Sequence, residues 1–153
     1  MYPLTLVKRD PTKKLEGKRI FKESTSIAMR KLMRLVVSDG TGSKAEVKGY
    51  YVGGKTGTAE IAQDGKYNKN RRMSSFFGVI PATDPQYMIY IIYNEPEGIK
   101  ETYGFAGGGW TAAPTVGAVF ERMATLYGME KLKEDSPEVQ EITNIEYKIR
   151  NET

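Results

Sequence analysis

The sequence predicts an α+β domain, in which helices pack on an antiparallel sheet of about four strands. Two apolar runs, residues 74–80 and 87–93, are joined by the short segment Pro-Ala-Thr-Asp-Pro. A parallel connection needs a dozen or more residues, so these two strands must be antiparallel neighbours. One segment with helical spacing precedes the strands and another follows them. This order is typical of a sheet with helices across it.

The first elements along the chain are a short strand and a helix. Residues 2–7 are expected to form a strand, with Pro3 favouring a sheet edge or a strand start. Residues 23–39 are expected to form a helix, which Gly40 ends. Its apolar stripe, in which the methionines are predicted to fill the core, contains Ala28, Met29, Leu32, Met33, Leu35 and Val36.

The middle of the chain predicts strands separated by polar segments. Residues 50–52 are rich in β-formers, residues 56–61 alternate as a strand does, and residues 64–72 are expected to be a polar loop. The basic cluster in that loop lacks an aromatic platform, so it is interpreted as a solvated loop, and no nucleic-acid partner is expected.

The last third begins with residues 94–110, which contain three consecutive glycines and form a loop long enough to be functional or mobile. A second helix is expected over residues 111–127, with Pro114 in its first turn and Gly128 after its end. Residues 129–153 are strongly charged and are expected to be a tail or a loosely docked segment.

Composition excludes several classes of chemistry. With 153 residues, the chain is one domain or a piece of one. It contains no Cys and no His, so thiol chemistry, disulfides and the usual transition-metal sites are excluded, and neither a metal nor a cofactor is expected. Any acid–base chemistry must use Lys, Asp, Glu or Tyr. The longest apolar run is strand-sized, and the chain opens without a leader, so it is expected to start within a domain.

The stretch from residue 53 to residue 60 reads Gly-Gly-Lys-Thr-Gly-Thr-Ala-Glu and permits two interpretations. Residues 49–56 match the phosphate-loop pattern G-x-x-x-x-G-K-[ST]. That loop needs an apolar strand before it and a helix after it. Here the preceding residues are polar, and the following residues alternate like a strand. The phosphate-loop interpretation is therefore rejected.

The second interpretation places the same residues on a strand. Alternation sends Lys55 and Gly57 to one face and Thr56 and Thr58 to the other. A lysine, two hydroxyls and a strand-edge N–H beside a residue without Cβ suit an anionic peptide end and its polarised carbonyl. The alternative, an edge strand with a solvated lysine, stays open on these residues alone.

Five segments follow one another in an informative order. They are the helix over residues 26–37, the Lys-Thr-Gly-Thr-Ala run from Lys55, residues 75–82, the Asn-Glu-Pro at residues 94–96 and the Trp-Thr-Ala-Ala-Pro at residues 110–114. In this order, with the Lys-Thr-Gly run as the central match, the chain resembles the C-terminal half of the transpeptidase domain of class B penicillin-binding proteins, most closely the septal, cell-division type. The resemblance covers residues 2–128.

This resemblance implies a peptidoglycan D,D-transpeptidase that acts on stem peptides and is acylated by β-lactams. Lys55 would supply positive potential, and the hydroxyls of Thr56 and Thr58 would bind the terminal carboxylate. Gly57 would make room for the acyl group, and the backbone N–H of Thr58 would form half of the oxyanion hole. In a further prediction, Tyr103 and Phe105 form an aromatic wall beside the site, with ordinary loop packing as the alternative.

The chain departs from the family pattern because it contains neither a Ser-x-x-Lys nor a Ser-x-Asn sequence. In the family both lie upstream, so residues 1–128 are expected to be half of an active site, unable to form the acyl-enzyme alone. The resemblance implies a parent anchored in the inner membrane with its domain on the periplasmic side, and divisome partners. Without the N-terminal half of the domain, an apolar face should be exposed, which favours a homo-oligomer or marginal stability. The rival hypothesis is a non-catalytic binding module.

Overall fold

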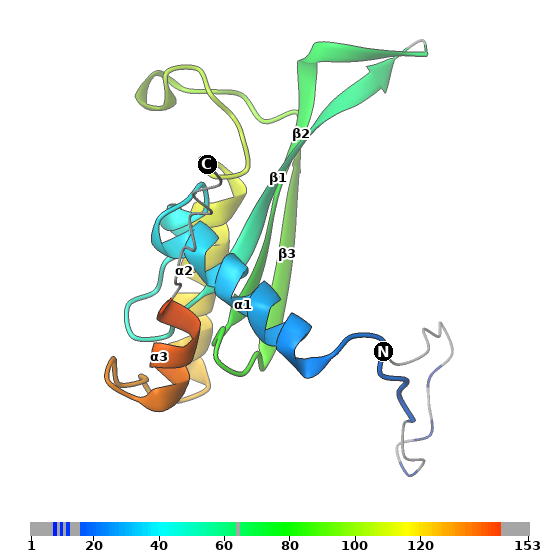
Figure 1. Ribbon diagram of the computed structural model, residues 1–153. Coiled ribbons are helices and arrows are strands. Elements are labelled where there is room, and N and C mark those ends of the chain that lie inside the picture. The colour runs from blue at the N-terminus through cyan, green and yellow to red at the C-terminus, as the bar shows by residue number, and fades with distance from the viewer. Residues whose placement is uncertain (1–7, 9, 11, 13–15, 64, 145–153) are drawn as a thin grey trace, which may run out of the picture.

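The computed structural model describes residues 8, 10, 12, 16–63 and 65–144 (Figure 1). The strand predicted at residues 2–7 lies outside them. The elements, in chain order, are α1 (Glu23–Ser38), the 3-10 turn η1 (Ser43–Ala45), β1 (Gly53–Gln63), β2 (Lys66–Ile80), β3 (Tyr87–Asn94), the 3-10 turn η2 (Lys100–Thr102), α2 (Ala112–Leu126) and α3 (Pro137–Thr143).

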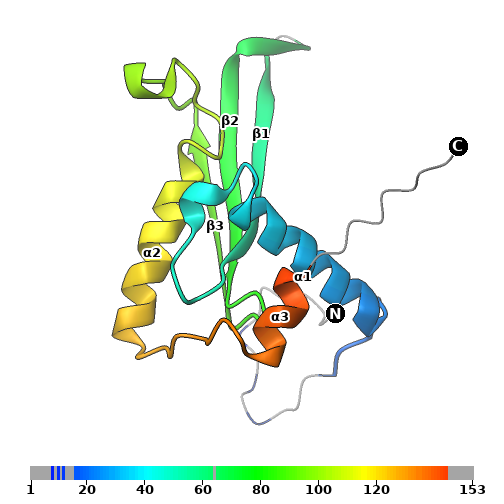
Figure 2. The same ribbon diagram turned by 60° about the vertical axis from the view of Figure 1, so that its left-hand side comes forward.

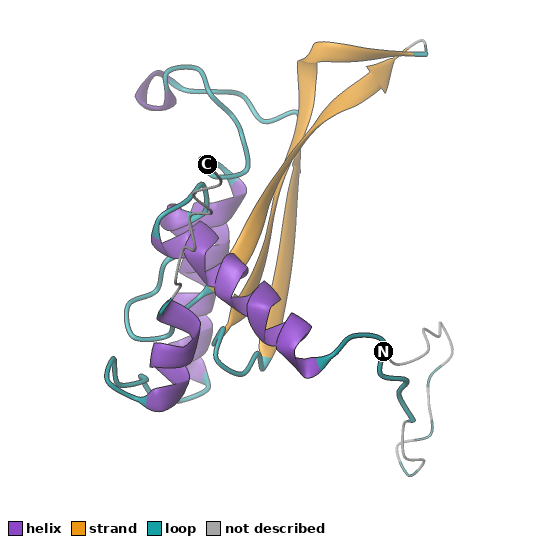
Figure 3. Cartoon of the chain, in the orientation of Figure 1, coloured by secondary structure: helices purple, strands orange, loops and turns teal. Residues whose placement is uncertain are grey.

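The three strands form one antiparallel sheet in the order β1-β2-β3. Helix α2 lies on one side of the strand layer, and α1 lies at its β1 edge (Figure 2 and Figure 3). Helices packed on an antiparallel sheet confirm the predicted α+β fold. In the register of the sheet, Lys55 of β1 lies opposite Phe77 of β2, and Phe77 lies opposite Tyr90 of β3. The antiparallel connection predicted between β2 and β3 is confirmed.

Helix α2 covers one face of the sheet and forms the core with it. Phe76 and Ile80 of β2 and Val116 and Phe120 of α2 are completely buried. A Cβ on Gly78 would come within 2.8 Å of Val116, so this glycine lets the helix approach the central strand closely. Val116 and Phe120 therefore lie on the buried face of α2.

Helix α1 packs against the edge strand β1, and a buried arginine fixes that contact. Arg34 donates from Nη1 to the carbonyl oxygen of Val52 at 2.8 Å, and its Nη2 lies 2.5 Å from Oε2 of Glu46. One guanidinium thus joins α1, the segment after η1 and the residue that enters β1.

The predicted apolar stripe of α1 is only partly correct. Met29 and Leu32 are each 54% exposed, so the prediction that the methionines fill the core is wrong for Met29. The buried residues of α1 are Arg34 and Val37 instead. The reason is that α1 crosses the sheet at its β1 edge, so only part of its circumference meets other elements (Figure 2).

The segment after Gly128 is not a loosely docked tail in its described part. It contains α3, whose Val139 and Ile142 are completely buried and which packs against α1. The backbone N–H of Leu132 donates to the carbonyl oxygen of Gly49 at 2.9 Å. Two apolar residues three positions apart were enough to bury one face of a short helix. The division of the chain at residue 128 remains a prediction.

The predicted polar loop over residues 64–72 is also wrong, because β2 begins at Lys66 and extends the hairpin with β1. The pairing shifts between Glu60 and Ile61, and the hairpin bends sharply there (Figure 1). Residues 50–52 do not form the predicted strand either. Tyr51 has φ +48°, which a strand does not allow.

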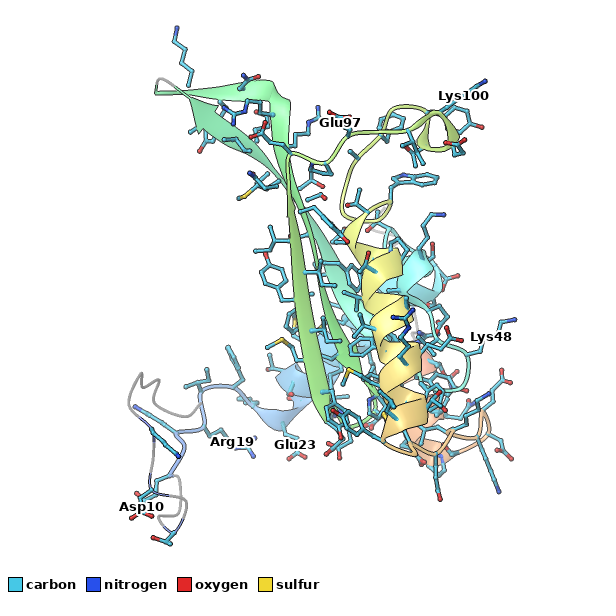
Figure 4. All side chains as sticks on the ribbon, turned by 180° about the vertical axis from the view of Figure 1, so that it is seen from behind. Asp10, Arg19, Glu23, Lys48, Glu97 and Lys100 are labelled. Carbon is cyan, nitrogen blue, oxygen red and sulfur yellow. The ribbon has the colours of Figure 1, made fainter. Side chains whose placement is uncertain are left out.

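Within the described part of the chain, the second face of the sheet is largely bare. Met88, Tyr90 and Ile92 alternate along β3 and are 61%, 56% and 52% exposed. Seen from behind, side chains project from this side of the strands, and no described element lies over them (Figure 4). The apolar character that a buried strand requires is therefore present on both faces of β3, but only one face is covered.

Candidate functional site

The stretch from residue 53 to residue 60 lies entirely within β1. A strand, not a helix, follows Lys55, so the arrangement required for phosphate binding is absent and its rejection is confirmed. Within the described residues, β1 pairs with β2 alone, which leaves its other edge open.

The alternation of β1 separates the candidate residues onto two faces. Thr56 and Thr58 lie on the face toward α2, where they line a cavity. Lys55 is exposed on the other face, and its Nζ donates to the carbonyl oxygen of Thr56 at 2.7 Å. The lysine and the two hydroxyls therefore share a strand but not a surface.

The cavity beside the two threonines, called here the threonine cavity, has a volume of about 430 Å³. It lies between η1, β1 and the glycine-rich loop before α2. Its lining residues are Gly40, Thr41, Ser43, Lys44, Thr56, Thr58, Gly107, Gly108, Gly109 and Trp110. None of these lining residues is acidic, so the polar groups around the cavity are hydroxyls, backbone groups and one ammonium.

The hydroxyls in the threonine cavity are held by neighbours from other elements. The Oγ1 atoms of Thr41 and Thr56 lie 2.8 Å apart. The backbone N–H of Gly108 donates to Oγ1 of Thr58 at 3.4 Å. Segments that are far apart in the sequence therefore fix both threonine side chains.

The glycine-rich loop requires its glycines because it passes directly over backbone carbonyls. A Cβ on Gly108 would come within 2.1 Å of the carbonyl oxygen of Ser75, and a Cβ on Gly109 within 2.2 Å of that of Thr41. Such distances are far below van der Waals contact. The loop can therefore close the cavity only with residues that have no side chain.

Gly57 also has a structural reason to lack a side chain. A Cβ there would meet Oγ of Ser75 on β2 at 2.5 Å. The Ser75 hydroxyl in turn accepts a hydrogen bond from the Tyr90 hydroxyl at 3.3 Å. The predicted role of Gly57, room for an acyl group, remains a prediction.

The structure does not bring Tyr103 and Phe105 to the threonine cavity. Tyr103 is 86% exposed and Phe105 is 62% exposed, and neither lines the cavity. They lie at and just after η2, in a loop that projects away from the strands (Figure 1). Local hydrogen bonds hold this turn, including the one from the Ile99 N–H to Oγ1 of Thr102 at 3.1 Å. Their role beside a substrate remains a prediction.

Three residues of the cavity, Thr41, Lys44 and Trp110, were not identified as site residues from the sequence. Thr41 and Lys44 are three residues apart, as are the serine and lysine of a Ser-x-x-Lys motif, but Thr41 is not a serine. This spacing does not predict that both residues line a cavity with Thr56 and Thr58. The Nζ of Lys44 lies 4.5 Å from the centroid of the Trp110 ring. Only the fold brings these residues, 66 positions apart, into contact.

One ion pair lies at the base of the bent hairpin. The Arg71 Nε donates to Oε2 of Glu95 at 2.9 Å, and Nη2 of Arg71 contacts Oε1 of Glu95. These hydrogen bonds from Arg71 lower the pKa of the Glu95 carboxyl below its usual value. This pair fixes the end of β3 and lies outside the threonine cavity.

The described residues contain no group of three or more His, Cys, Asp or Glu side chains that could hold a metal ion. No helix in the described part of the chain is both long and apolar enough to cross a membrane. The threonine cavity is lined by hydroxyls, one lysine, one aromatic ring and backbone groups.

Comparison with known proteins gives consistent matches. The family model of the penicillin-binding protein transpeptidase domain matches residues 1–121. The probable peptidoglycan D,D-transpeptidase FtsI of Caulobacter vibrioides is 41% identical over 143 residues, which are 88% of this chain and 24% of that protein. The stage V sporulation protein D of Bacillus subtilis is 40% identical over 129 residues, 84% of this chain and 19% of that protein.

A solved structure agrees with these matches. The transpeptidase domain of Burkholderia pseudomallei penicillin-binding protein 3 superposes with a TM-score of 0.67 at 29% identity, covering 81% of this chain and 36% of that one. The chain therefore spans about a quarter or less of the two curated relatives, and about a third of the solved domain.

Proposed function

The chain belongs to the penicillin-binding protein transpeptidase domain family, and we propose that it is the C-terminal half of the transpeptidase domain of a septal peptidoglycan D,D-transpeptidase. The observation that carries this proposal is the Lys-Thr-Gly sequence on the open edge strand β1, with Thr56 and Thr58 at a cavity.

In the proposed reaction, a serine attacks the carbonyl between the two terminal D-alanines of a stem peptide. The last D-alanine leaves, and the acyl group passes from the serine to an amine. Thr56 and Thr58 would donate hydrogen bonds to the terminal carboxylate. The backbone N–H of Thr58 would stabilise the oxyanion, and Lys55 would supply positive potential on the opposite face of the strand.

The serine is not within this sequence, because none of its serines has a lysine three residues later. We therefore propose that this half binds and polarises the substrate, while the preceding half of the domain supplies the nucleophile. The bare face that exposes Met88, Tyr90 and Ile92 supports this proposal, since an apolar surface of that kind needs a partner. The same surface would acquire its cover when the two halves assemble.

The proposed setting follows from the parent enzyme. Its domain would lie on the periplasmic side of the inner membrane, anchored by a segment outside this sequence. Stem peptides and β-lactams would be its ligands, and other cell-division proteins would be its partners. No resident metal or cofactor enters the proposed reaction.

Covalent labelling with a fluorescent penicillin tests the proposal. The chain alone should remain unlabelled, and mixing it with the preceding half of the domain should restore labelling. Lys55→Ala should abolish the restored labelling, because the ammonium that raises the potential at the site is lost. Lys48→Ala is the matched control, since Lys48 lines neither face of β1 and points away from the body (Figure 4).

Two results would contradict the proposal. Labelling of the isolated chain would mean that it contains a nucleophile that the proposed reaction places elsewhere. Assembly with the preceding half without any labelling would favour the rival hypothesis, a non-catalytic binding module. The measurement is in-gel fluorescence after denaturation, which reports only covalent acyl-enzyme.

A further inference from the structure

The face of β1 that carries the two threonine hydroxyls has a cation of its own. Lys55 lies on the opposite face, and its Nζ donates to the Thr56 carbonyl oxygen. Among the residues that line the threonine cavity, the basic one is Lys44, from η1. Thr56, Thr58 and Lys44 therefore line the same cavity, and Lys44 is its basic residue.

The contact that holds Lys44 leaves its charge available. Its Nζ lies 4.5 Å from the centroid of the Trp110 ring, the geometry of a cation–π contact. An aromatic ring orients an ammonium without neutralising it, whereas a carboxylate partner would. The lining of the threonine cavity includes no acidic residue, so no carboxylate competes for the ammonium inside it. Lys44 also lines a neighbouring cavity, together with Glu46 and Glu121.

The hydroxyl hydrogen bonds point to the same ligand chemistry. Oγ1 of Thr58 accepts from the Gly108 N–H, so its own proton remains available to a ligand. Thr41 and Thr56 share one hydroxyl–hydroxyl hydrogen bond, which leaves one of their two protons available. The cavity therefore offers three donors, one ammonium and two hydroxyls, and an anion with two or more acceptor oxygens satisfies them best.

We propose that Lys44 is the cation that binds the substrate carboxylate, together with the hydroxyls of Thr56 and Thr58, and that Trp110 positions its ammonium. This inference rests on the proposed function only for the source of the carboxylate, the end of a stem peptide. The inference gives the two lysines different roles. Lys44 binds the carboxylate on the α2 side of β1, and Lys55 supplies positive potential on the opposite face.

A titration of the isolated 153-residue chain tests the anion site without the nucleophile. The probes are N-acetyl-D-alanyl-D-alanine and its C-terminal amide. Binding is measured by NMR, from the chemical shifts of the backbone amides of Thr56, Thr58 and Gly108. The acid should shift these resonances with saturation, and the amide should bind about tenfold more weakly, because it cannot pair with the ammonium.

Variants assign the effect to Lys44. Lys44→Met should weaken binding of the acid about tenfold and leave binding of the amide unchanged, while Lys44→Arg should retain most of the preference for the acid. Trp110→Leu should weaken binding of the acid severalfold, since the ring no longer holds the Lys44 ammonium in the cavity. Lys48→Met is the matched control and should bind both probes like the unmodified chain.

The inference is overturned if acid and amide bind equally, if neither probe shifts the three resonances, or if Lys44→Met retains the full preference for the acid. The labelling experiment with both halves separates this outcome from failure of the proposed function. If the chain shows the Lys44-dependent preference but is never labelled after assembly, the anion site is supported and the proposed enzymatic function is contradicted. If the assembled domain is labelled and its Lys44→Met variant still prefers a penicillin acid to its methyl ester, the enzymatic function is supported and the proposed role of Lys44 is contradicted.

Discussion

The two faces of the sheet have similar sequences but opposite environments. On the α2 side, Phe76 and Ile80 are completely buried against Val116 and Phe120. On the other side, Met88, Tyr90 and Ile92 are more than half exposed. Strand β3 is apolar at nearly every position, as expected for a strand covered on both faces.

The difference shows that the described part of the chain exposes an apolar surface that its own elements do not cover. Burial of the covered face stabilises the described fold, whereas the exposed apolar side chains of the bare face indicate a site where a partner packs. The candidate site lies at the edge between them, where Thr56 and Thr58 face the packed side and Lys55 faces the bare side.

The largest expected effect is a core truncation on the covered face. Phe120→Ala should lower the free energy of unfolding by about 3–5 kcal/mol, because it removes a buried ring and leaves a cavity. The matched change on the bare face, Met88→Ala, should cost about 0.5 kcal/mol or less, since Met88 is already in solvent. Urea denaturation measures both, and equal losses would mean that the second face is covered in solution.

A smaller effect is expected on self-association through the bare face. We expect the chain to form a homo-oligomer, and Ile92→Lys should weaken its association constant about tenfold by placing a charge in the apolar contact. Leu126→Lys, at an exposed position of α2, is the control and should leave association unchanged. Sedimentation velocity over a concentration series measures this, and a monomer at every concentration would contradict the expectation.

The smallest effect concerns the ion pair at the end of β3. The pKa of Glu95 is lowered by hydrogen bonds from Arg71, so the pair stabilises the fold above the unfolded-state pKa of Glu95. That contribution is lost as the pH falls through the lower pKa of the folded state. Arg71→Gln should return the Glu95 pKa toward its usual value, as measured by carboxyl NMR shifts against pH. An unchanged titration would show that Arg71 does not set this pKa.

The elements with strong local signals could be predicted from the sequence alone. Helical periodicity with Gly40 and Gly128 after the last turns located α1 and α2, and the short connection at residues 81–85 fixed the antiparallel pairing of β2 and β3. The strand character of the Lys-Thr-Gly segment followed from its alternation. These features depend on neighbours within a few residues, so local rules suffice.

Which of these surfaces are covered, and which residues surround Thr56 and Thr58, depends on how the elements pack together. Periodicity identified an apolar stripe on α1 but could not show that Arg34, bound to Glu46 and to the Val52 carbonyl, is buried while Met29 is exposed. It could not predict that α3 docks on α1. The contact between Lys44 and Trp110 also depends on the fold, because cation–π contacts between residues far apart in sequence leave no local pattern.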